Sequence, residues 1–418
     1  MGIEAIQRFE YQRLTVRDCP RLRPQHLQLF ERYFESTKGK YFSLVPGGVC
    51  FANYVGVIQV GDLTIEILPK ADKTSGNSKV WKAVLLDMLR ECHWMQVDAS
   101  SYANLKLKTD SVLENYILIF LKHCEALLHR GLIRKYRRVE ENCTSLKGKL
   151  QFSRHLRYNL VHQERFFVDH GVLDRHNVFN RVLVKALRLI PTLVTNASIA
   201  DFVGRLILDW PELTDIIVDE QLFDRLVFDR KTEAYREAIF IAKMILLNYR
   251  PDISGGNNHM LAILFDMNEL WEEFIFRRVR KAGAAKGMQV TRQRQRTFWE
   301  GDSFSKVVKP DILVHTANKI IVLDTKWKIY ENLRAIDDEL KQMYVYSRMW
   351  NASKTAILSP FNGASVTTRT NGFFHESSEE GTRLGQRTCK WLGVNILSNN
   401  PGVATLSSNI GEEILINL

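Results

Sequence analysis

The chain has 418 residues, of which 45% are hydrophobic and 25% charged, and this balance is typical of a globular protein with two or three domains. No apolar run approaches the roughly 20 residues of a membrane-spanning helix, and the first residues lack the pattern of a signal peptide, so we expect a cytoplasmic protein with no membrane partner. The net charge of +11 suits a polyanion such as nucleic acid, and six cysteines without a CxxC pair argue against a zinc site.

The first part of the chain is predicted to be rich in β-strands. Residues 41–70 contain short apolar runs separated by a Gly-Gly break and by a Gly61-Asp62 turn, and Pro69 ends the last run. Residues 63–68 show the period-two alternation of a half-buried strand. We therefore expect a small barrel or sandwich and place a β-rich domain at residues 1–75.

The middle of the chain is predicted to be mainly helical. A polar, turn-rich stretch at 70–79 is followed by amphipathic patterns at residues 80–95, 111–132, 176–194 and 232–248. Residues 251–259, which are rich in Gly, Asn and Pro, form the best candidate for a linker. These boundaries predict a helical region at 76–255.

The last part of the chain, residues 256–418, is predicted to be an α/β sandwich. A long helix is expected over 260–283, although Asn268 and Glu269 offer a later start. A hairpin at 309–330, a helix at 332–350 and a strand at 354–360 follow. The whole chain is thus expected to be a multidomain protein of mixed α and β structure.

The hairpin carries charged residues where its apolar strands should only pack. Antiparallel pairing about Asn318 places Asp311 opposite residue 324 or 325, so the carboxylates of Asp311 and Asp324 come close together. Lys326 lies two residues after Asp324 and therefore on the same face of the strand. A lone Asp-x-Lys is most often a surface ion pair, but here the spacing, the turn and the apolar strands favour a functional site.

Two facing carboxylates repel each other, and a divalent cation between them removes that penalty. Their hard oxygen atoms, together with the backbone carbonyl of Thr325, predict a Mg²⁺ site, with Mn²⁺ as the alternative ion. Such an ion would polarise a phosphodiester and lower the pKa of a water molecule. Lys326 would orient or activate that water, or stabilise charge on the phosphate.

A run of basic residues follows the predicted helix. Between Arg277 and Arg296 there are eight Lys or Arg and no Asp or Glu. This run would contact DNA phosphates without sequence specificity, although a solvated helix face is the plain alternative. The candidate DNA-binding residues are Arg277, Arg278, Lys281, Arg292, Arg294 and Arg296.

These features resemble the PD-(D/E)xK nuclease superfamily. Pro310-Asp311 matches its PD, and Asp324-Thr325-Lys326 matches its (D/E)xK. The resemblance implies a nuclease-like fold for the last domain and a metal-binding glutamate on the preceding helix. Among Glu269, Glu272 and Glu273 we favour Glu272, against the alternative of a solvated helix face. Gln342 and Tyr346, one helical turn apart, resemble the QxxxY element, which implies a catalytic role on a DNA strand or in orienting the site; ordinary packing of Tyr346 is the alternative.

The rest of the chain resembles the McrC family of restriction subunits. Three stretches carry this resemblance: YVGVIQVGDLTIEILPK at 54–70, LKGKLQFSRHLR at 146–157 and HNVFNRVLVKALRLI at 176–190. MNELWEEF at 267–274 resembles the helix that enters the family's nuclease domain. Residues after about 362 form a longer tail than this pattern has.

The resemblance implies a Mg²⁺-dependent DNA endonuclease subunit in an antiphage restriction system. It implies a McrB-like AAA+ GTPase hexamer as partner, docked by the first two domains, and double-stranded DNA as substrate. GTP would be bound by that partner, in agreement with the lack of a GxxxxGK[ST] phosphate loop in this sequence. Lys147, Lys149 and Arg154 are candidates for stimulating the GTPase, with structural or DNA-contacting roles as alternatives. A stand-alone repair or recombination nuclease and a non-catalytic adaptor of an AAA+ ring remain open.

Overall fold

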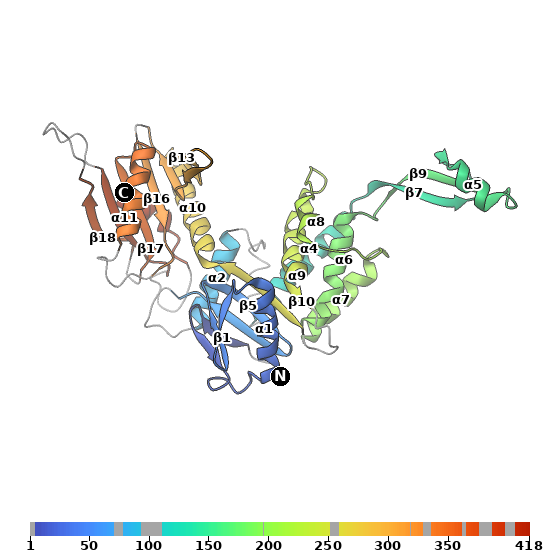
Figure 1. Ribbon diagram of the computed structural model, residues 1–418, viewed down its shortest axis with the longest axis horizontal. Helices are drawn as coiled ribbons and strands as arrows, with labels where there is room; N and C mark the ends of the chain where they lie inside the picture. The colour runs from blue at the N-terminus through green and yellow to red at the C-terminus, as the bar shows by residue number, and fades with distance from the viewer. Residues whose placement is uncertain are drawn as a thin grey trace. The chain divides into compact units, whose positions relative to one another are not determined.

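The computed structural model describes residues 5–70, 78–92, 111–194, 196–250, 259–317, 319–328, 336–361, 365–375, 387–397 and 406–418. These residues fall into two compact units. One unit contains the described residues between 98 and 263, and the other joins the described residues of 5–97 to those of 264–418 (Figure 1). No described helix is long and apolar enough to cross a membrane. The linker expected at 251–259 lies outside the described residues except for His259.

The unit of residues 98–263 contains helices and a long β-arm. The helices are α4 (Val112–Arg130), α6 (Val178–Leu189), α7 (Ala197–Asp209), α8 (Glu220–Asp224) and α9 (Arg236–Asn248), with short 3-10 turns at Ile190–Thr192 and Glu233–Tyr235. The predicted helices at 111–132, 176–194 and 232–248 are therefore confirmed in position. The short strand β10 (Tyr249–Arg250) pairs with the start of β11 (Met260–Asp266).

The β-arm was not predicted from the sequence. It consists of β7 (Lys135–Cys143) and β9 (Phe166–Asp174), which pair along their whole length, with β8 (Lys149–Leu150) and α5 (Phe152–Asn159) at the far end. Figure 1 shows this arm extending away from the helices of its own unit. Gly148 has φ +64°, and a Cβ there would lie 2.5 Å from the carbonyl oxygen of Asp169, so the Leu-Lys-Gly-Lys-Leu stretch needs glycine at its centre.

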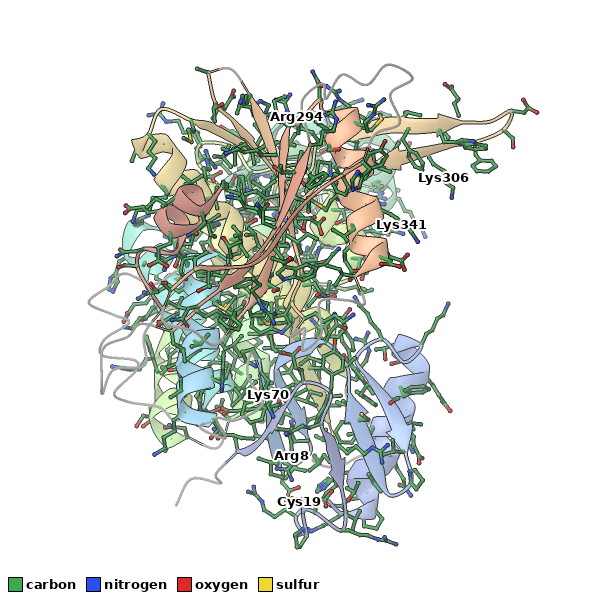
Figure 2. All side chains as sticks on the ribbon, turned by 90° about the vertical axis from the view of Figure 1, so that its left-hand side faces the viewer. Arg8, Cys19, Lys70, Arg294, Lys306 and Lys341 are labelled. Atoms are coloured by element: carbon green, nitrogen blue, oxygen red, sulfur yellow. The ribbon has the colours of Figure 1, made fainter. Side chains whose placement is uncertain are left out.

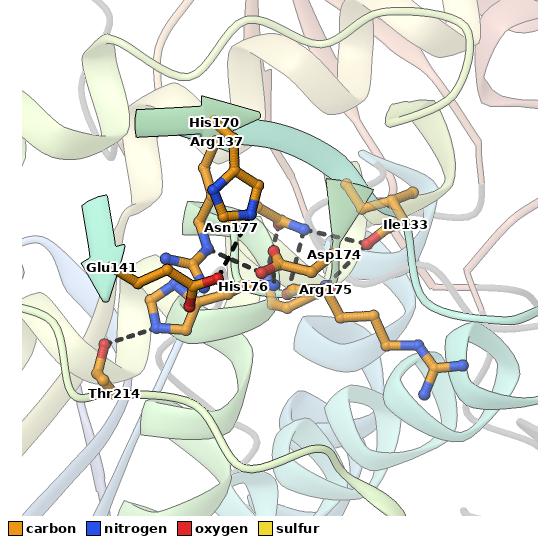
Figure 3. Close-up of polar contacts among 10 residues, drawn as sticks. Ile133, Arg137, Glu141, His170, Asp174, Arg175, His176, Asn177 and Thr214 are labelled. Atoms are coloured by element: carbon orange, nitrogen blue, oxygen red, sulfur yellow. Dashed lines mark hydrogen bonds and ion pairs between the residues drawn. The ribbon is translucent and has the colours of Figure 1, made fainter. Parts of the chain in front are cut away.

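Asparagines of the predicted helix at 176–190 hold the base of the arm (Figure 3). The side chain of Asn177 caps α6 by accepting from the backbone NH of Asn180 and donates to the carbonyl oxygen of Ile133 at 3.0 Å. The buried amide of Asn180 donates to the carbonyl oxygens of Ile133 and Arg175 and accepts from the hydroxyl of Tyr235 at 2.9 Å. The residues that precede β7 and follow β9 are thereby both tied to α6.

The first residues of the second unit form two small sheets and two helices. One sheet has the order β2-β4-β3, from β2 (Arg13–Thr15), β4 (Gly48–Phe51) and β3 (Phe42–Val45), and packs with α1 (Pro24–Thr37). In the other, β6 (Leu63–Leu68) lies between β1 (Ile6–Phe9) and β5 (Tyr54–Val60). The half-buried alternation expected for 63–68 is wrong, because α2 (Ser78–Glu91) covers β6 and Glu66 is buried against Lys82 at 2.9 Å.

The last residues form a six-stranded mixed sheet. Its order is β12-β15-β16-β17-β19-β18, built from β12 (Gln289–Arg292), β15 (Ile312–His315), β16 (Ile320–Thr325), β17 (Lys354–Pro360), β19 (Thr388–Val394) and β18 (Thr367–Phe373). The tail after residue 362 thus completes the sheet. A separate hairpin is formed by β13 (Arg296–Glu300) and β14 (Ser305–Val308).

Three helices accompany this sheet: α10 (Met267–Ala285), α11 (Asp337–Met349) and α12 (Ile410–Asn417). The helix α11 covers a buried cluster on β15, β16 and β17 that includes Leu313, Val322 and Ile357. The single helix expected over 260–283 is wrong, since 260–266 form strand β11 and the side chain of Asp266 caps α10. The run MLAILF is apolar at every position and buried throughout, so it carried no helical periodicity.

We expect Asn180→Ala to lower the free energy of unfolding of the full chain by about 1–3 kcal/mol, because it leaves the buried partners of this amide without hydrogen bonds. Denaturant unfolding measures the loss. The exposed Asn371→Ala on β18 is the control, with an expected change within about 0.5 kcal/mol. Equal effects of the two substitutions would contradict the role of the Asn180 network.

Candidate active site on the mixed sheet

The predicted pairing of the two acidic residues is confirmed by the strand register. In the antiparallel pair β15–β16, Ile312 lies opposite Leu323 and Leu313 opposite Val322, so Asp311, just before β15, comes opposite Asp324. Directly opposite residues share a face of the sheet, and Leu313 and Val322 belong to the cluster under α11. Asp311 and Asp324 therefore lie at the end of this buried face.

Neighbouring groups hold both carboxylates. Asp311 accepts hydrogen bonds at Oδ2 from the backbone NH of Thr325 at 2.7 Å and from its hydroxyl at 2.8 Å. Asp324 is 1% exposed, and its Oδ2 lies 3.0 Å from Nζ of Lys326. Thr325 therefore fixes the carboxylate of Asp311, and Lys326 neutralises the charge of Asp324.

Burial and mutual repulsion dominate the electrostatics of this site. Burial raises the pKa of Asp324, and the neighbouring Asp311 raises it further, while Lys326 opposes both effects. The pKa of Asp311 is also raised by burial, against the hydrogen bonds from Thr325. Burial alone would lower the pKa of Lys326, but Asp324 and Asp311 raise it overall. One ammonium group therefore faces two carboxylates that burial disfavours in their charged form.

The helix α11 positions the lysine. Nζ of Lys326 donates to Oε1 of Gln342 at 3.4 Å, Nε2 of Gln342 donates to the hydroxyl of Tyr346 at 2.7 Å, and that hydroxyl donates to the carbonyl oxygen of Lys309 at 3.1 Å. Tyr346 is 4% exposed and packs edge-on against Trp350. Tyr346 is therefore buried and bonded to Gln342 and to the backbone of Lys309.

Of the three candidate glutamates on α10, Glu272 is the one coupled to the acids. Burial raises the pKa of Glu272, and the carboxylate of Asp311 raises it further. Oε1 of Glu272 accepts a hydrogen bond from Nε2 of Gln293 at 2.8 Å. Glu273 is instead buried in ion pairs with Arg277 and Arg292. Within the described part of the chain, no three His, Cys, Asp or Glu side chains are close enough to form a ready metal cluster. Two carboxylates are the donors that the geometry brings together.

The predicted DNA-binding residues divide into two groups. Three of them are engaged with the protein. Arg277 pairs with Glu273 at 2.5 Å, and Arg292 also pairs with Glu273. Arg278 pairs with Glu91 at 2.6 Å, and its side chain is 12% exposed. Arg278 also donates to the carbonyl oxygen of Ser408, so these contacts hold its guanidinium within the protein, and its assignment to DNA stays a prediction.

The other three candidates lie on the surface. Lys281 and Arg294 are exposed, and exposed Arg296 donates to the carbonyl oxygen of Met349 and lies over the ring of Trp350. Figure 2 shows Arg294 at the edge of the sheet and Lys306 on the projecting hairpin β13–β14. That hairpin also exposes Trp299 and other apolar side chains, and sequence reasoning missed it although its strands flank the turn EGDS.

Comparisons with known proteins agree with this architecture. Residues 49–359, more than half of the chain, match the family model described as McrBC 5-methylcytosine restriction system component. The Escherichia coli K12 protein described as type IV methyl-directed restriction enzyme EcoKMcrBC is 23% identical over 248 residues, which cover 56% of this chain and 70% of that protein.

Two solved structures share the fold. A chain in the refined half-complex of the tetradecameric assembly of Thermococcus gammatolerans McrB AAA+ hexamers with bound McrC has a TM-score of 0.70 at 20% identity, covering 99% of this chain and 100% of that one. A chain in the cryo-EM structure of the Thermococcus gammatolerans McrBC complex has a TM-score of 0.53 at 21% identity, covering 67% and 88%. The family resemblance seen in the sequence is confirmed: the chain belongs to the McrBC 5-methylcytosine restriction system component family.

Proposed function

We propose that this chain is the Mg²⁺-dependent endonuclease subunit of a GTP-driven restriction complex that cuts double-stranded DNA. The observation that carries the proposal is the meeting of Asp311, Asp324 and Lys326 at one end of the β15–β16 pair. Membership of a restriction-system family and a fold shared with chains of McrBC assemblies support it. The order helix, antiparallel strands, helix, parallel strand is also consistent with a PD-(D/E)xK nuclease domain.

The donor set fits Mg²⁺, or Mn²⁺ in its place. Asp311 and Asp324 would hold the ion, with the backbone carbonyl of Thr325 and the carboxylate of Glu272 as further oxygen donors. Two carboxylates with remaining water ligands are typical of protein Mg²⁺ sites, so a third acidic ligand is not required. When bound, the ion would polarise the scissile phosphodiester and lower the pKa of the attacking water.

The residues of the chain supply orientation and charge. Lys326, held between Asp324 and Gln342, would direct its ammonium toward the developing charge of the phosphate. Tyr346 would keep Gln342 in place through its 2.7 Å hydrogen bond. Arg294, Lys281 and Arg296 are the candidate contacts to neighbouring phosphates.

We propose a McrB-like AAA+ GTPase hexamer as the partner and the β-arm as its docking element. The arm exposes apolar side chains, including Tyr136, Leu160 and Val161, which are 78%, 71% and 85% exposed. Clusters of exposed apolar side chains often mark protein–protein contacts. The Thermococcus assemblies that share the fold contain McrB AAA+ hexamers, and the present sequence has no phosphate loop of its own, so GTP would bind to the partner. Lys147 and Lys149 on the arm are exposed, whereas Arg154 pairs with Glu140.

Substitution of the site should separate cutting from assembly. We expect Asp311→Ala and Lys326→Ala to reduce DNA cleavage by at least about 10²-fold, while GTPase stimulation of the partner is unchanged. Asp311→Ala would remove a ligand of the metal ion, and Lys326→Ala would remove the ammonium group that stabilises the developing charge of the phosphate. Cleavage and GTP hydrolysis are measured in the same reconstituted complex with Mg²⁺. The controls are exposed Asp302→Ala and Lys319→Ala, which should cut normally. Normal cutting by either site variant would refute the assignment.

The same assay distinguishes the alternatives. A stand-alone nuclease would cut DNA with Mg²⁺ in the absence of partner and GTP. A non-catalytic adaptor would stimulate the GTPase but show no cutting that depends on Asp311. The paired carboxylates and Lys326 favour catalysis over the adaptor.

The arm should act only on assembly. We expect the double substitution Leu160→Asp and Val161→Asp to weaken partner binding at least tenfold, because charges replace apolar contacts at the interface. Binding and GTPase stimulation are the measurements. Leu208→Asp on α7, at an equally exposed apolar position of the same unit, should change neither. If the arm variant bound as tightly as the unchanged protein, another surface would have to hold the partner.

The metal site also predicts a pH dependence. Because the folded-state pKa of Asp324 is raised above its unfolded value, the contribution of Asp324 to the stability of the metal-free protein is greatest below that unfolded value and is lost as pH rises through the raised pKa. We expect Asp324→Asn to reduce this loss by about 1.4 kcal/mol for each unit of pKa difference. Mg²⁺ at pH 8 should stabilise the unchanged protein and not the variant.

Denaturant unfolding at several pH values, with a chelator or with Mg²⁺, measures these effects. Exposed Asp302→Asn serves as the control and should behave as the unchanged protein. If the stability of the Asp324 variant changed with pH as steeply as that of the unchanged protein, Asp324 would not have the raised pKa of a buried carboxyl group.

A further inference from the structure

A cavity of about 710 Å³ lies beside the candidate active site, with Lys326 and Gln342 in its wall. Residues from the beginning of the chain, Glu10, Tyr11 and Lys70, line it as well. These residues belong to the same compact unit as the mixed sheet. The candidate nuclease site is therefore not enclosed by the last residues of the chain alone.

Strand direction explains how these early residues come together. The strands β1 and β6 are parallel neighbours with Phe9 opposite Leu68, and the backbone NH of Glu10 donates to the carbonyl oxygen of Leu68 at 3.1 Å. Because parallel strands end at the same edge of a sheet, Glu10-Tyr11 and Pro69-Lys70 emerge side by side. Lys70, which closes the family-like stretch at 54–70 and is labelled in Figure 2, thus lines the same cavity as Lys326.

Glu10 fastens this edge to the catalytic strand. Its side chain is 5% exposed, and Oε1 accepts hydrogen bonds from Nε1 of Trp327 at 2.6 Å and from the backbone NH of Lys70 at 3.0 Å. Trp327 follows Lys326 directly and is itself buried. Burial raises the pKa of Glu10 to about 7, against the hydrogen bonds from Trp327 and Lys70. The position of Lys70 is consequently tied to that of Lys326.

Tyr11 has a backbone conformation that requires support. Its φ of 61° lies in the left-handed region, which is unfavourable for a bulky residue. Hydrogen bonds between Phe9 and Gln12 in both directions, at 3.0 and 3.2 Å, hold the turn. Burial of the side chain does not offset this unfavourable backbone conformation, because Tyr11 remains 63% exposed. Strain retained without a packing gain is typical of residues that act on a ligand.

The chemistry of the cavity matches a nucleotide. Lys70, Lys326 and Lys328 bring ammonium groups to it, Asn268 and Gln342 bring amides, and Tyr11 brings an aromatic face. Three acids also line it: Glu10 is buried and bonded to Trp327, Asp338 lies 3.5 Å from Lys341, and Glu339 follows Asp338 on α11. Ammonium groups bind phosphates, and exposed aromatic rings stack on nucleobases.

We propose that this cavity binds the DNA nucleotide adjacent to the scissile phosphate, with Lys70 on a backbone phosphate and Tyr11 stacked on a base. This deepens the proposed function and rests on it. The N-terminal β-region would then be part of the substrate-binding surface as well as of the scaffold. Lys70 and Tyr11 bind the strand, whereas Lys326 acts on the reacting phosphate.

The test is single-turnover cleavage by the full complex with Mg²⁺ and GTP, measured over a range of enzyme concentrations. For Lys70→Ala we expect the concentration that gives half the maximal rate to rise about three- to tenfold, with the maximal rate within twofold of the unchanged protein. The magnitude of the slope of log affinity against log salt concentration should fall by about 0.7–0.9, the value for one lost phosphate contact. Tyr11→Ala should weaken binding similarly, and Tyr11→Phe should restore it because the ring is kept.

Arg17→Ala is the matched control, since it removes a positive charge from an exposed site of the same β-region, and it should leave both parameters unchanged. An unchanged half-maximal concentration for Lys70→Ala and Tyr11→Ala would overturn the nucleotide site. So would an equal effect of Arg17→Ala, or a loss of maximal rate as large as that of Lys326→Ala. Failure of the proposed function would look different, because Asp311→Ala would then cut normally or the unchanged complex would not cut.

Discussion

The close approach of two carboxylates, half-buried Asp311 and buried Asp324, is the constraint on which the rest of the site depends. Burial raises the free energy of each carboxylate in its charged form, and neighbouring groups offset part of this cost. Thr325 donates two hydrogen bonds to Asp311, and Lys326 pairs with Asp324. Gln342 and Tyr346 then hold the lysine, and Tyr346 is fixed by the core under α11. A bound cation would relieve the repulsion that remains between the two carboxylates.

The two units suit different tasks in this account. The arm of residues 135–174 exposes apolar side chains far along a paired ribbon, and its base is secured by Asn177 and Asn180. The other unit joins the mixed sheet to the first β-region through the hydrogen bond between Trp327 and Glu10. Docking and cutting would thus use separate surfaces, which is what a subunit controlled by a motor protein requires.

The hairpin could be predicted because its information is local: two apolar runs, a short turn and acids at matching distances set the register within about a residue. Strand β11 could not, because a run that is apolar at every position has no periodicity to distinguish a strand from a helix. The pairing of Arg278 with Glu91 and the contact of Glu10 with Trp327 depend on residues distant in the chain. A single sequence carries no signal for such contacts.

The most direct measurement of the central claim is anomalous diffraction from crystals of the full chain soaked in Mn²⁺. The account predicts a peak between the carboxylates of Asp311 and Asp324, within about 2.5 Å of an oxygen atom of each, that disappears on soaking crystals of Asp324→Asn. A peak bound elsewhere, or one that persists in the variant, would contradict the claim that these two acids form the metal site.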